Sequence, residues 1–210
     1  MREIKKLGIL GGTFNPIHYG HLVAADCARD ACHLDQVLFV PSARPPHKAL
    51  DAVLDCQHRC EMVRIAVQDN PAFAVSTLEL ERRGLSYTVE TVAACLQKFP
   101  GAEIYFILGV DALLLMNTWK DVDRLAGLCN FIVVTRPGYR LSQDEERFQG
   151  IPTALWDKII VIPIPGLSIS SSEIRHRVAR GQTIRYLLPV GVEQFIRANN
   201  LYREEVEADD

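Results

Sequence analysis

Residues 6–21 read KLGILGGTFNPIHYGH, and this stretch decides the fold. The apolar run 6–10 predicts a buried strand, and the paired glycines Gly11 and Gly12 predict a turn that follows it directly. The helical pattern that comes next predicts a helix that begins near Gly20. A strand, a glycine-rich turn and a helix in this order place the free N–H groups of the helix opposite the turn. This arrangement is typical of anion-binding sites.

The rest of the chain repeats this alternation of apolar runs and helical patterns. Near-continuous apolar strands separated by helices are typical of a parallel sheet that is covered on both faces. We therefore predict an α/β fold with a doubly wound, Rossmann-like parallel sheet, although the Rossmann GxGxxG spacing is absent. Predicted strands cover 6–10, 36–40, 73–76, 104–108, 131–134 and 159–162, and further helices cover 56–69, 89–96 and 189–199.

We expect one domain over residues 1–210, with a C-terminal helical part at about 170–203. Segment 136–158 is polar and poorly periodic, which predicts a loop or a small excursion before the last strand. Residues 204–210 read as an acidic, frayed tail.

The composition is that of an ordinary globular protein with a net charge of -3 and a pI of about 6.1. This acidic balance disfavours binding to nucleic acid, and no apolar run reaches the length of a membrane span. We expect a cytoplasmic protein with reduced cysteines. Cys56 and Cys60 share a predicted helical face with Val63 and Val67, which indicates core positions; a metal site with His58 is the less favoured alternative.

Two histidines lie where the first turn meets the first helix. His18 and His21 are three residues apart on either side of Gly20, so that their rings can point the same way and donate N–H groups to phosphate oxygens. The alternative is an ordinary turn with two incidental histidines. The combination with a glycine-rich turn at the end of a strand favours a phosphate site, because parallel α/β folds bind ligands at that edge.

A second candidate phosphate site follows the last predicted strand. Ser170 and Glu173 have the spacing of a capping box, and Gly181 is placed to end the helix. Arg175 lies one turn inside this helix and can grip two phosphate oxygens with its guanidinium group. A capping box alone would be structural, but serines and an arginine at this edge of the sheet indicate phosphate binding.

His18-Tyr19-Gly20-His21 resembles the HxGH motif of the nucleotidyltransferase superfamily. The longer string GGTFNPIHYGHL is similar to that of bacterial nicotinate-nucleotide adenylyltransferases, and ISSSEIR at 169–175 resembles their second motif, ISSxxIR. The resemblance extends from Gly8 to Tyr202. Asn15 stands where many members have Asp, which fits a role in the turn. The resemblance implies that His18, His21 and Arg175 are catalytic, and that ATP contacts also involve Gly11, Gly12, Thr13, Phe14, Gly109, Asp111, Ser170 and Ser171.

Further residues of the predicted pocket lie between the two motifs. Gly109 permits close approach of a ligand, and Asp111 can accept hydrogen bonds from ribose hydroxyls or serve as a helix N-cap. Trp119 has polar neighbours that predict partial exposure, although it would also suit the core. The loop with His47 and Lys48 is either solvated or in contact with phosphate. The resemblance assigns His47, Lys48, Tyr87, Thr88, Trp119 and Arg136 to the acceptor substrate.

The resemblance implies transfer of an adenylyl group from ATP to nicotinate mononucleotide, a step in NAD biosynthesis. Mg²⁺ is then expected as a cofactor bound mainly through the ATP phosphates, with no dedicated metal ligands in the protein. Two alternatives stay open: a pantetheine-phosphate adenylyltransferase, and a nucleotide-binding regulatory module without catalysis. A homo-oligomer is compatible with the sequence.

Overall fold

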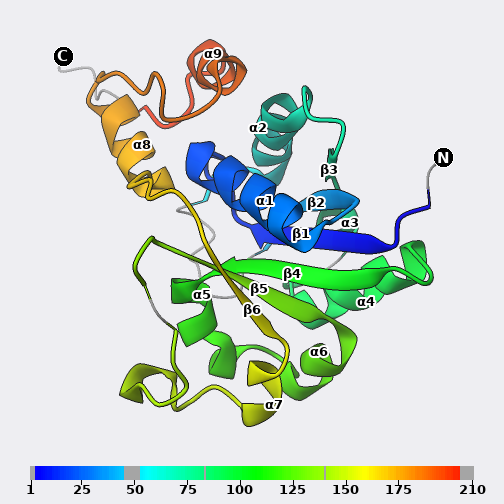
Figure 1. The fold of residues 1–210 in the computed structure, drawn as a ribbon. Helices are drawn as coiled ribbons and strands as arrows, with labels where there is room; N and C mark the ends of the chain where they lie inside the picture. Colours follow the sequence, from blue (N-terminus) through cyan, green and yellow to red (C-terminus); the bar gives the residue numbers. More distant parts are fainter. Residues whose placement is uncertain (1–2, 45–52, 83, 140, 204–210) are drawn as a thin grey trace.

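The computed structural model describes residues 3–44, 53–82, 84–139 and 141–203. Its centre is a six-stranded sheet with the strand order β3-β2-β1-β4-β5-β6, in which every neighbouring pair is parallel (Figure 1). The predicted parallel α/β sheet is confirmed. The strands are β1 Lys6–Gly12, β2 Gln36–Pro41, β3 Phe73–Val75, β4 Glu103–Gly109, β5 Asn130–Thr135 and β6 Ile159–Pro163.

Helices cover both faces of this sheet (Figure 1). Residues of α1, α2, α8 and α9 pack on one face, and residues of α4, α5, α6 and α7 pack on the other. The predicted doubly wound arrangement is therefore confirmed. The helices are α1 Tyr19–Cys32, α2 Cys56–Val67, α3 Leu78–Glu81, α4 Thr88–Lys98, α5 Val110–Leu114, α6 Val122–Leu128, α7 Thr153–Trp156, α8 Ser171–Ala179 and α9 Val190–Ala198, with 3₁₀ turns η2 Met116–Thr118 and η3 Glu146–Phe148.

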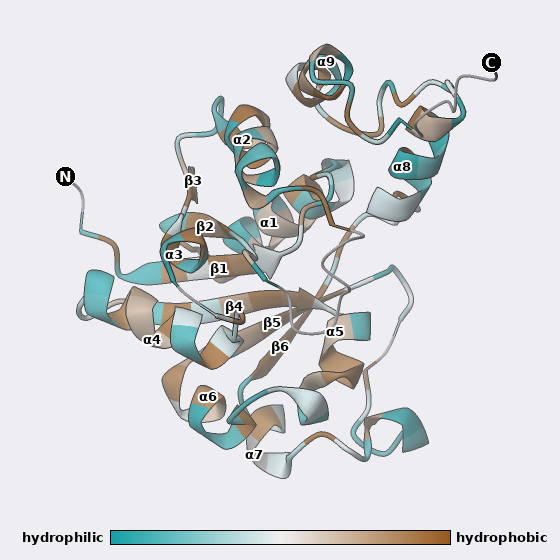
Figure 2. Ribbon diagram, turned by 180° about the vertical axis from the view of Figure 1, so that it is seen from behind, coloured by the Kyte–Doolittle hydropathy of each residue, from teal (hydrophilic) through white to brown (hydrophobic). Residues whose placement is uncertain are grey.

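Burial of the apolar faces accounts for this arrangement. The hydropathy colouring shows brown strands between helices whose outer surfaces carry much of the teal (Figure 2). In β1, Leu7 and Ile9 face the α4–α7 side and Leu10 faces the α1 side, as the alternation of a strand requires. In α8 and α9 the inward side chains are Ile174, Val192 and Ile196, which are buried, while Val178 and Phe195 are partly buried against the same core.

Segment 136–158 departs from the prediction. It contains η3 and α7, and it contributes Phe148, Ile151 and Leu155 to the core at exposures of 0%, 6% and 0%. Helices of three or four residues are too short to show a helical period, so the sequence pattern had no means of revealing them. The same reason applies to α3 and η2, and α5 and α6, with five and seven residues, also span no more than about two helical turns.

The core position predicted for Cys60 is confirmed, whereas Cys56 is only half-buried. Cys60, Val63 and Val67 are buried, and burial raises the pKa of the Cys60 thiol. Among the described residues, no cluster of three or more His, Cys, Asp or Glu side chains could hold a metal ion. Within the same residues, no helix is long and apolar enough to cross a membrane.

Candidate functional site

Two cavities open where the strands end at their carboxyl termini. They have volumes of about 440 Å³ and about 480 Å³, and Gly109, the last residue of β4, lines both. The strand order reverses between β1 and β4, and in parallel sheets ligands bind at this point. The first cavity is lined by Gly12, Thr13, His21, Thr88, Trp119 and Lys120, and the second by Gly20, Asp111, Thr135, Arg136, Tyr139 and Arg147.

The two histidines form a stacked pair at the start of α1. Their ring centroids are 3.8 Å apart, and the His18 backbone N–H donates to His21 Nδ1 at 3.3 Å. A neutral His21 therefore carries its proton on Nε2, and its ring lines the first cavity. His18 lies behind it with 6% exposure, and desolvation lowers the pKa of its imidazole to about 4. The pair thus presents one cavity-lining ring, His21, supported by the buried ring of His18.

Gly20 provides the space that the His18 ring occupies. A Cβ at this position would lie 3.0 Å from both Cε1 and Nδ1 of His18. The glycine of the motif is therefore explained by packing of the preceding histidine. Gly127 in α6 is a matched contrast, because a Cβ there would meet nothing within 4 Å.

We expect Gly20→Ala to destabilise the fold and Gly127→Ala to stabilise it. Ala is favoured over Gly inside helices by roughly 0.5–1 kcal/mol, whereas forced overpacking costs roughly 1–3 kcal/mol. Denaturant unfolding of both variants measures whether each substitution lowers or raises the free energy of unfolding. Equal stabilisation by both substitutions would show that Gly20 does not make room for His18.

Gly11 and Gly12 correct the predicted strand boundary. They complete β1, which runs to Gly12, so the turn begins two residues later than the sequence suggested. A Cβ on Gly12 would lie 3.1 Å from the Phe14 ring, and one on Gly11 would lie 3.3 Å from Phe106. Aromatic packing of the chain itself therefore already requires small residues here. Both glycines also line the first cavity, as expected for a close ligand approach.

The N-terminus of α8 docks onto the turn that follows β1. Arg175 Nη1 donates to the Asn15 carbonyl at 2.8 Å, and Ser171 Oγ donates to the Pro16 carbonyl at 2.8 Å. Ser170 is the N-cap, and its Oγ accepts from the Glu173 N–H, which confirms this half of the predicted capping box. The structure thus brings the two sequence motifs together across more than 150 residues of chain.

Asn15 itself is buried and acts within this turn. Its Oδ1 accepts from the Tyr202 hydroxyl at 2.8 Å, and burial raises the pKa of that hydroxyl far above its usual range. The turn role that the sequence suggested for Asn15 agrees with this contact. Tyr202 anchors the end of the described chain beside the site, a contact that no local pattern could have predicted.

An aromatic and cationic wall closes the first cavity. Trp119 is half-buried, as predicted, and its ring meets Phe106 edge to face at 5.8 Å. The first turn of α4 begins at Thr88 with Tyr87 as its N-cap, so that free N–H groups lie at this wall. Lys120 Nζ lies 4.2 Å from the centre of the Tyr87 ring.

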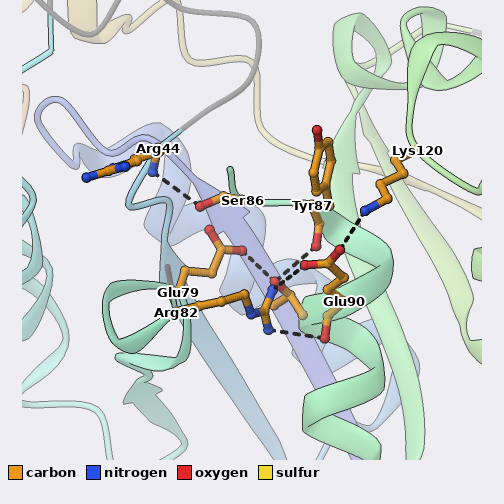
Figure 3. Close-up of polar contacts among 8 residues, drawn as sticks. Arg44, Glu79, Arg82, Ser86, Tyr87, Glu90 and Lys120 are labelled. Atoms are coloured by element: carbon orange, nitrogen blue, oxygen red, sulfur yellow. Dashed lines mark hydrogen bonds and ion pairs between the residues drawn. The ribbon is translucent and has the colours of Figure 1, made fainter. Parts of the chain in front are cut away.

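Glu90 connects three segments around this wall (Figure 3). Its Oε1 accepts from Lys120 at 2.8 Å, and its Oε2 lies 3.4 Å from Arg82 Nη1. The hydrogen bond from Lys120 holds the pKa of the Glu90 carboxyl below its usual range. The neighbouring Thr91 hydroxyl donates a hydrogen bond to Glu79 Oε1 at 2.6 Å, and Glu79 also lines the first cavity.

The second cavity is lined by three of the predicted residues, Gly109, Asp111 and Arg136. Phe14, His18, Ser170, Ser171 and Arg175 line neither cavity. Asp111 lies exposed in the first turn of α5, whose N-cap is Gly109; the N-cap role considered for Asp111 is therefore wrong. Arg136 and Tyr139 line the same cavity, and the Arg147 guanidinium lies 4.8 Å from the Tyr139 ring centre. His47 and Lys48 lie outside the described residues.

Sequence reasoning missed four residues at this site: Arg59, Glu79, Lys120 and Tyr202. Arg59 is 1% exposed, which is unusual for an arginine, and it was hidden because charged residues within an amphipathic helix normally face solvent. The other three owe their roles to contacts between distant segments.

Comparison with known proteins decides the family. A family model described as cytidylyltransferase-like matches residues 9–177. A probable nicotinate-nucleotide adenylyltransferase of Moorella thermoacetica is 48% identical over 96% of this chain and 94% of its own length. The protein of the same name from Thermoanaerobacter sp. is 45% identical over 98% of both.

The chain belongs to the nicotinate-nucleotide adenylyltransferase family. The resemblance of its two motifs to this family is thereby confirmed. The nicotinic acid mononucleotide adenylyltransferase of Plasmodium falciparum, solved in complex with NaAD, has the same fold as this chain, with a TM-score of 0.75. It covers 94% of this chain and 97% of its own, at 23% identity.

Proposed function

We propose that this chain transfers the adenylyl group of ATP to nicotinate mononucleotide, giving nicotinate adenine dinucleotide and pyrophosphate. The observation that carries the proposal is the placement of His21 and the α8-anchored turn beside two cavities that share Gly109. Two cavities with a common wall suit two nucleotides whose phosphates meet. We assign the first cavity to the pyridine nucleotide and the second to the adenosine of ATP. This assignment moves Arg136 from the acceptor substrate, where the resemblance put it, to the side of ATP.

The reaction follows from the charges of the two substrates. An oxygen of the acceptor 5′-phosphate attacks the α-phosphorus of ATP, a new P–O bond forms, and the bond to the β-phosphate oxygen breaks as pyrophosphate leaves. A phosphate monoester is already an anionic nucleophile, so no general base is needed. The protein must align two polyanions and stabilise the charge at the reacting phosphorus. His21 Nε2–H, Arg175 and the α8 N-terminus are the donors suited to this task.

We retain Mg²⁺ as a proposed cofactor. The Asp111 carboxylate is exposed at the second cavity and offers an oxygen ligand, whereas the described residues supply no cluster of ligands. This donor set suits a cation that reaches the site with ATP and keeps its phosphate and water ligands. When bound, it would neutralise part of the phosphate charge. Asp111 and the backbone around Gly109 would then orient the nucleotide.

We expect a preference for the acidic pyridine nucleotide over its amide. The N–H groups at the start of α4 and the ammonium of Lys120 favour a carboxylate, whereas an amide would turn its own N–H donors toward them. Donors left facing donors cost about 1–3 kcal/mol, or roughly 5–150-fold in discrimination. The measurement is kcat/KM for nicotinate and nicotinamide mononucleotide under identical ATP and Mg²⁺. Equal values of kcat/KM for the two nucleotides would show that the N–H groups at the start of α4 do not select the carboxylate.

Pyrophosphate release from ATP with a panel of acceptors tests the function as a whole. The panel contains nicotinate mononucleotide, nicotinamide mononucleotide and phosphopantetheine, so that a pantetheine-phosphate adenylyltransferase would reveal itself by its acceptor. A protein that binds ATP but releases no pyrophosphate from it with any acceptor of the panel would instead be a regulatory module. We further propose a cytoplasmic protein that does not bind nucleic acid, consistent with its pI of about 6.1.

A further inference from the structure

Arg59 is a fully buried cation directly behind the phosphate-binding turn. Its Nη1 donates to the Thr13 carbonyl at 2.7 Å, its Nε to the Leu54 carbonyl at 2.8 Å and its Nη2 to the Ala43 carbonyl at 3.4 Å. The side chain is 1% exposed. Burial of a guanidinium group is costly, so its position requires a compensating role.

None of the ion pairs formed by the described residues involves Arg59. Its three acceptors are neutral backbone carbonyls, and desolvation lowers the pKa of the guanidinium group. A buried positive charge without a paired carboxylate attracts anions bound nearby, because the surrounding protein screens it less than water does. The phosphates of the proposed substrates are such anions.

The contact with Thr13 fixes the orientation of a peptide group. In a trans peptide the C=O and the following N–H point in opposite directions, and the cis peptide of this turn is the one between Asn15 and Pro16. Because the Thr13 carbonyl points to Arg59, the Phe14 N–H points away from Arg59. No hydrogen bond joins this N–H to another described residue.

Two arginines hold the turn from different helices. Arg59 of α2 binds the Thr13 carbonyl, and Arg175 of α8 binds the Asn15 carbonyl. Between them Phe14 adopts a left-handed backbone with φ of 48°, a conformation that costs a non-glycine residue roughly 1–2 kcal/mol. The surrounding contacts must stabilise this conformation.

We propose that Arg59 is a positioning residue for phosphate binding, which holds the Thr13–Phe14 peptide so that the Phe14 N–H is presented to a substrate phosphate. This inference rests on the proposed function, because the anion is taken to be a phosphate of ATP or of the acceptor. Arg59 acts through the turn and does not itself touch the substrate.

Arg59→Lys and Arg59→Gln test the proposal against a control that destabilises the same helix. Met62→Ala removes a buried apolar side chain three residues further along α2 that can form no hydrogen bond to the Thr13 carbonyl. All variants are assayed well below their own melting temperatures. We expect kcat/KM to fall about 10–100-fold in both Arg59 variants, as misplacement of catalytic groups typically does, and to stay within about threefold in Met62→Ala.

Binding supplies a readout that a purely structural role would not change. The Kd for inorganic pyrophosphate, measured calorimetrically, should rise in both Arg59 variants and stay unchanged in Met62→Ala. If the Arg59 variants match Met62→Ala in Kd and in kcat/KM, Arg59 is structural only and the proposal fails. A wild-type protein that releases no pyrophosphate would instead refute the proposed function.

The wild-type protein provides a test that does not depend on variants that fold. In a sample labelled with ¹⁵N-phenylalanine, the Phe14 amide proton should shift downfield when pyrophosphate is added. Its signal is assigned by loss in Phe14→Leu. An unchanged Phe14 signal at saturating pyrophosphate would overturn the proposal, and a shift would support it.

Discussion

His21→Ala is expected to lower kcat by about 100–1,000-fold, the typical effect of removing one preorganised donor to developing charge. His21 lines the first cavity, and its Nδ1 is engaged by the His18 N–H, so that Nε2 is the nitrogen that carries the proton to a phosphate oxygen. The ring is half-buried and packs on Phe14 and His18, so the variant should lose some stability but remain folded. Steady-state kinetics and thermal unfolding of the same samples separate the two effects.

His176→Ala is the matched control, because the same side chain is removed from an exposed position in α8. It should leave kcat within about twofold. If His21→Ala has no larger effect than His176→Ala, the phosphate contact of His21 is wrong. His18→Ala is a less direct test, since His18 is buried and its removal also takes away the ring that supports His21.

The sheet was predictable because its information is local. Strands buried on both faces of a parallel sheet are runs of apolar residues, and such runs were present at β1, β2, β4 and β5. The edge strand β6 is also an apolar run, although its Ile160 and Val161 are exposed. The short helices were not predictable, because α3 and α7 have four residues each and are fixed by contacts with distant segments. Phe148 and Leu155 show the consequence, since both are fully buried within a segment that is polar on average.

The site divides in the same way. His21 was identified from a local pattern at the end of a strand, and Thr88 and Trp119 through the resemblance to the family; all three line the first cavity. Arg59 and Tyr202 could not be identified, because their roles depend on the Thr13 carbonyl and the Asn15 side chain, which lie far away in the sequence. Motifs therefore located residues that line the first cavity or dock beside it, whereas the groups that hold those motifs in place required the tertiary structure.

Arg175→Lys is expected to lower kcat/KM by about 100-fold and to weaken ATP binding. One guanidinium nitrogen already donates to the Asn15 carbonyl at 2.8 Å, which directs the plane of the group and leaves its other N–H donors for phosphate oxygens. Lysine is a point charge without this planar fork, so it cannot hold the turn and grip a phosphate with one fixed geometry. Because the substitution keeps the positive charge, the loss in kcat/KM measures the contribution of the planar guanidinium geometry.

Arg177→Lys provides the comparison within the same helix. Arg177 pairs with Glu173 at 2.8 Å on the surface of α8, and exposed pairs of this kind contribute roughly 0–1 kcal/mol. Its replacement should leave kcat/KM and the Kd for ATP within about twofold. An Arg175→Lys variant as active as Arg177→Lys would reduce Arg175 to a residue that docks α8 onto the turn. A selective loss in Arg175→Lys, with an unchanged melting temperature, would place its free N–H donors on the phosphates.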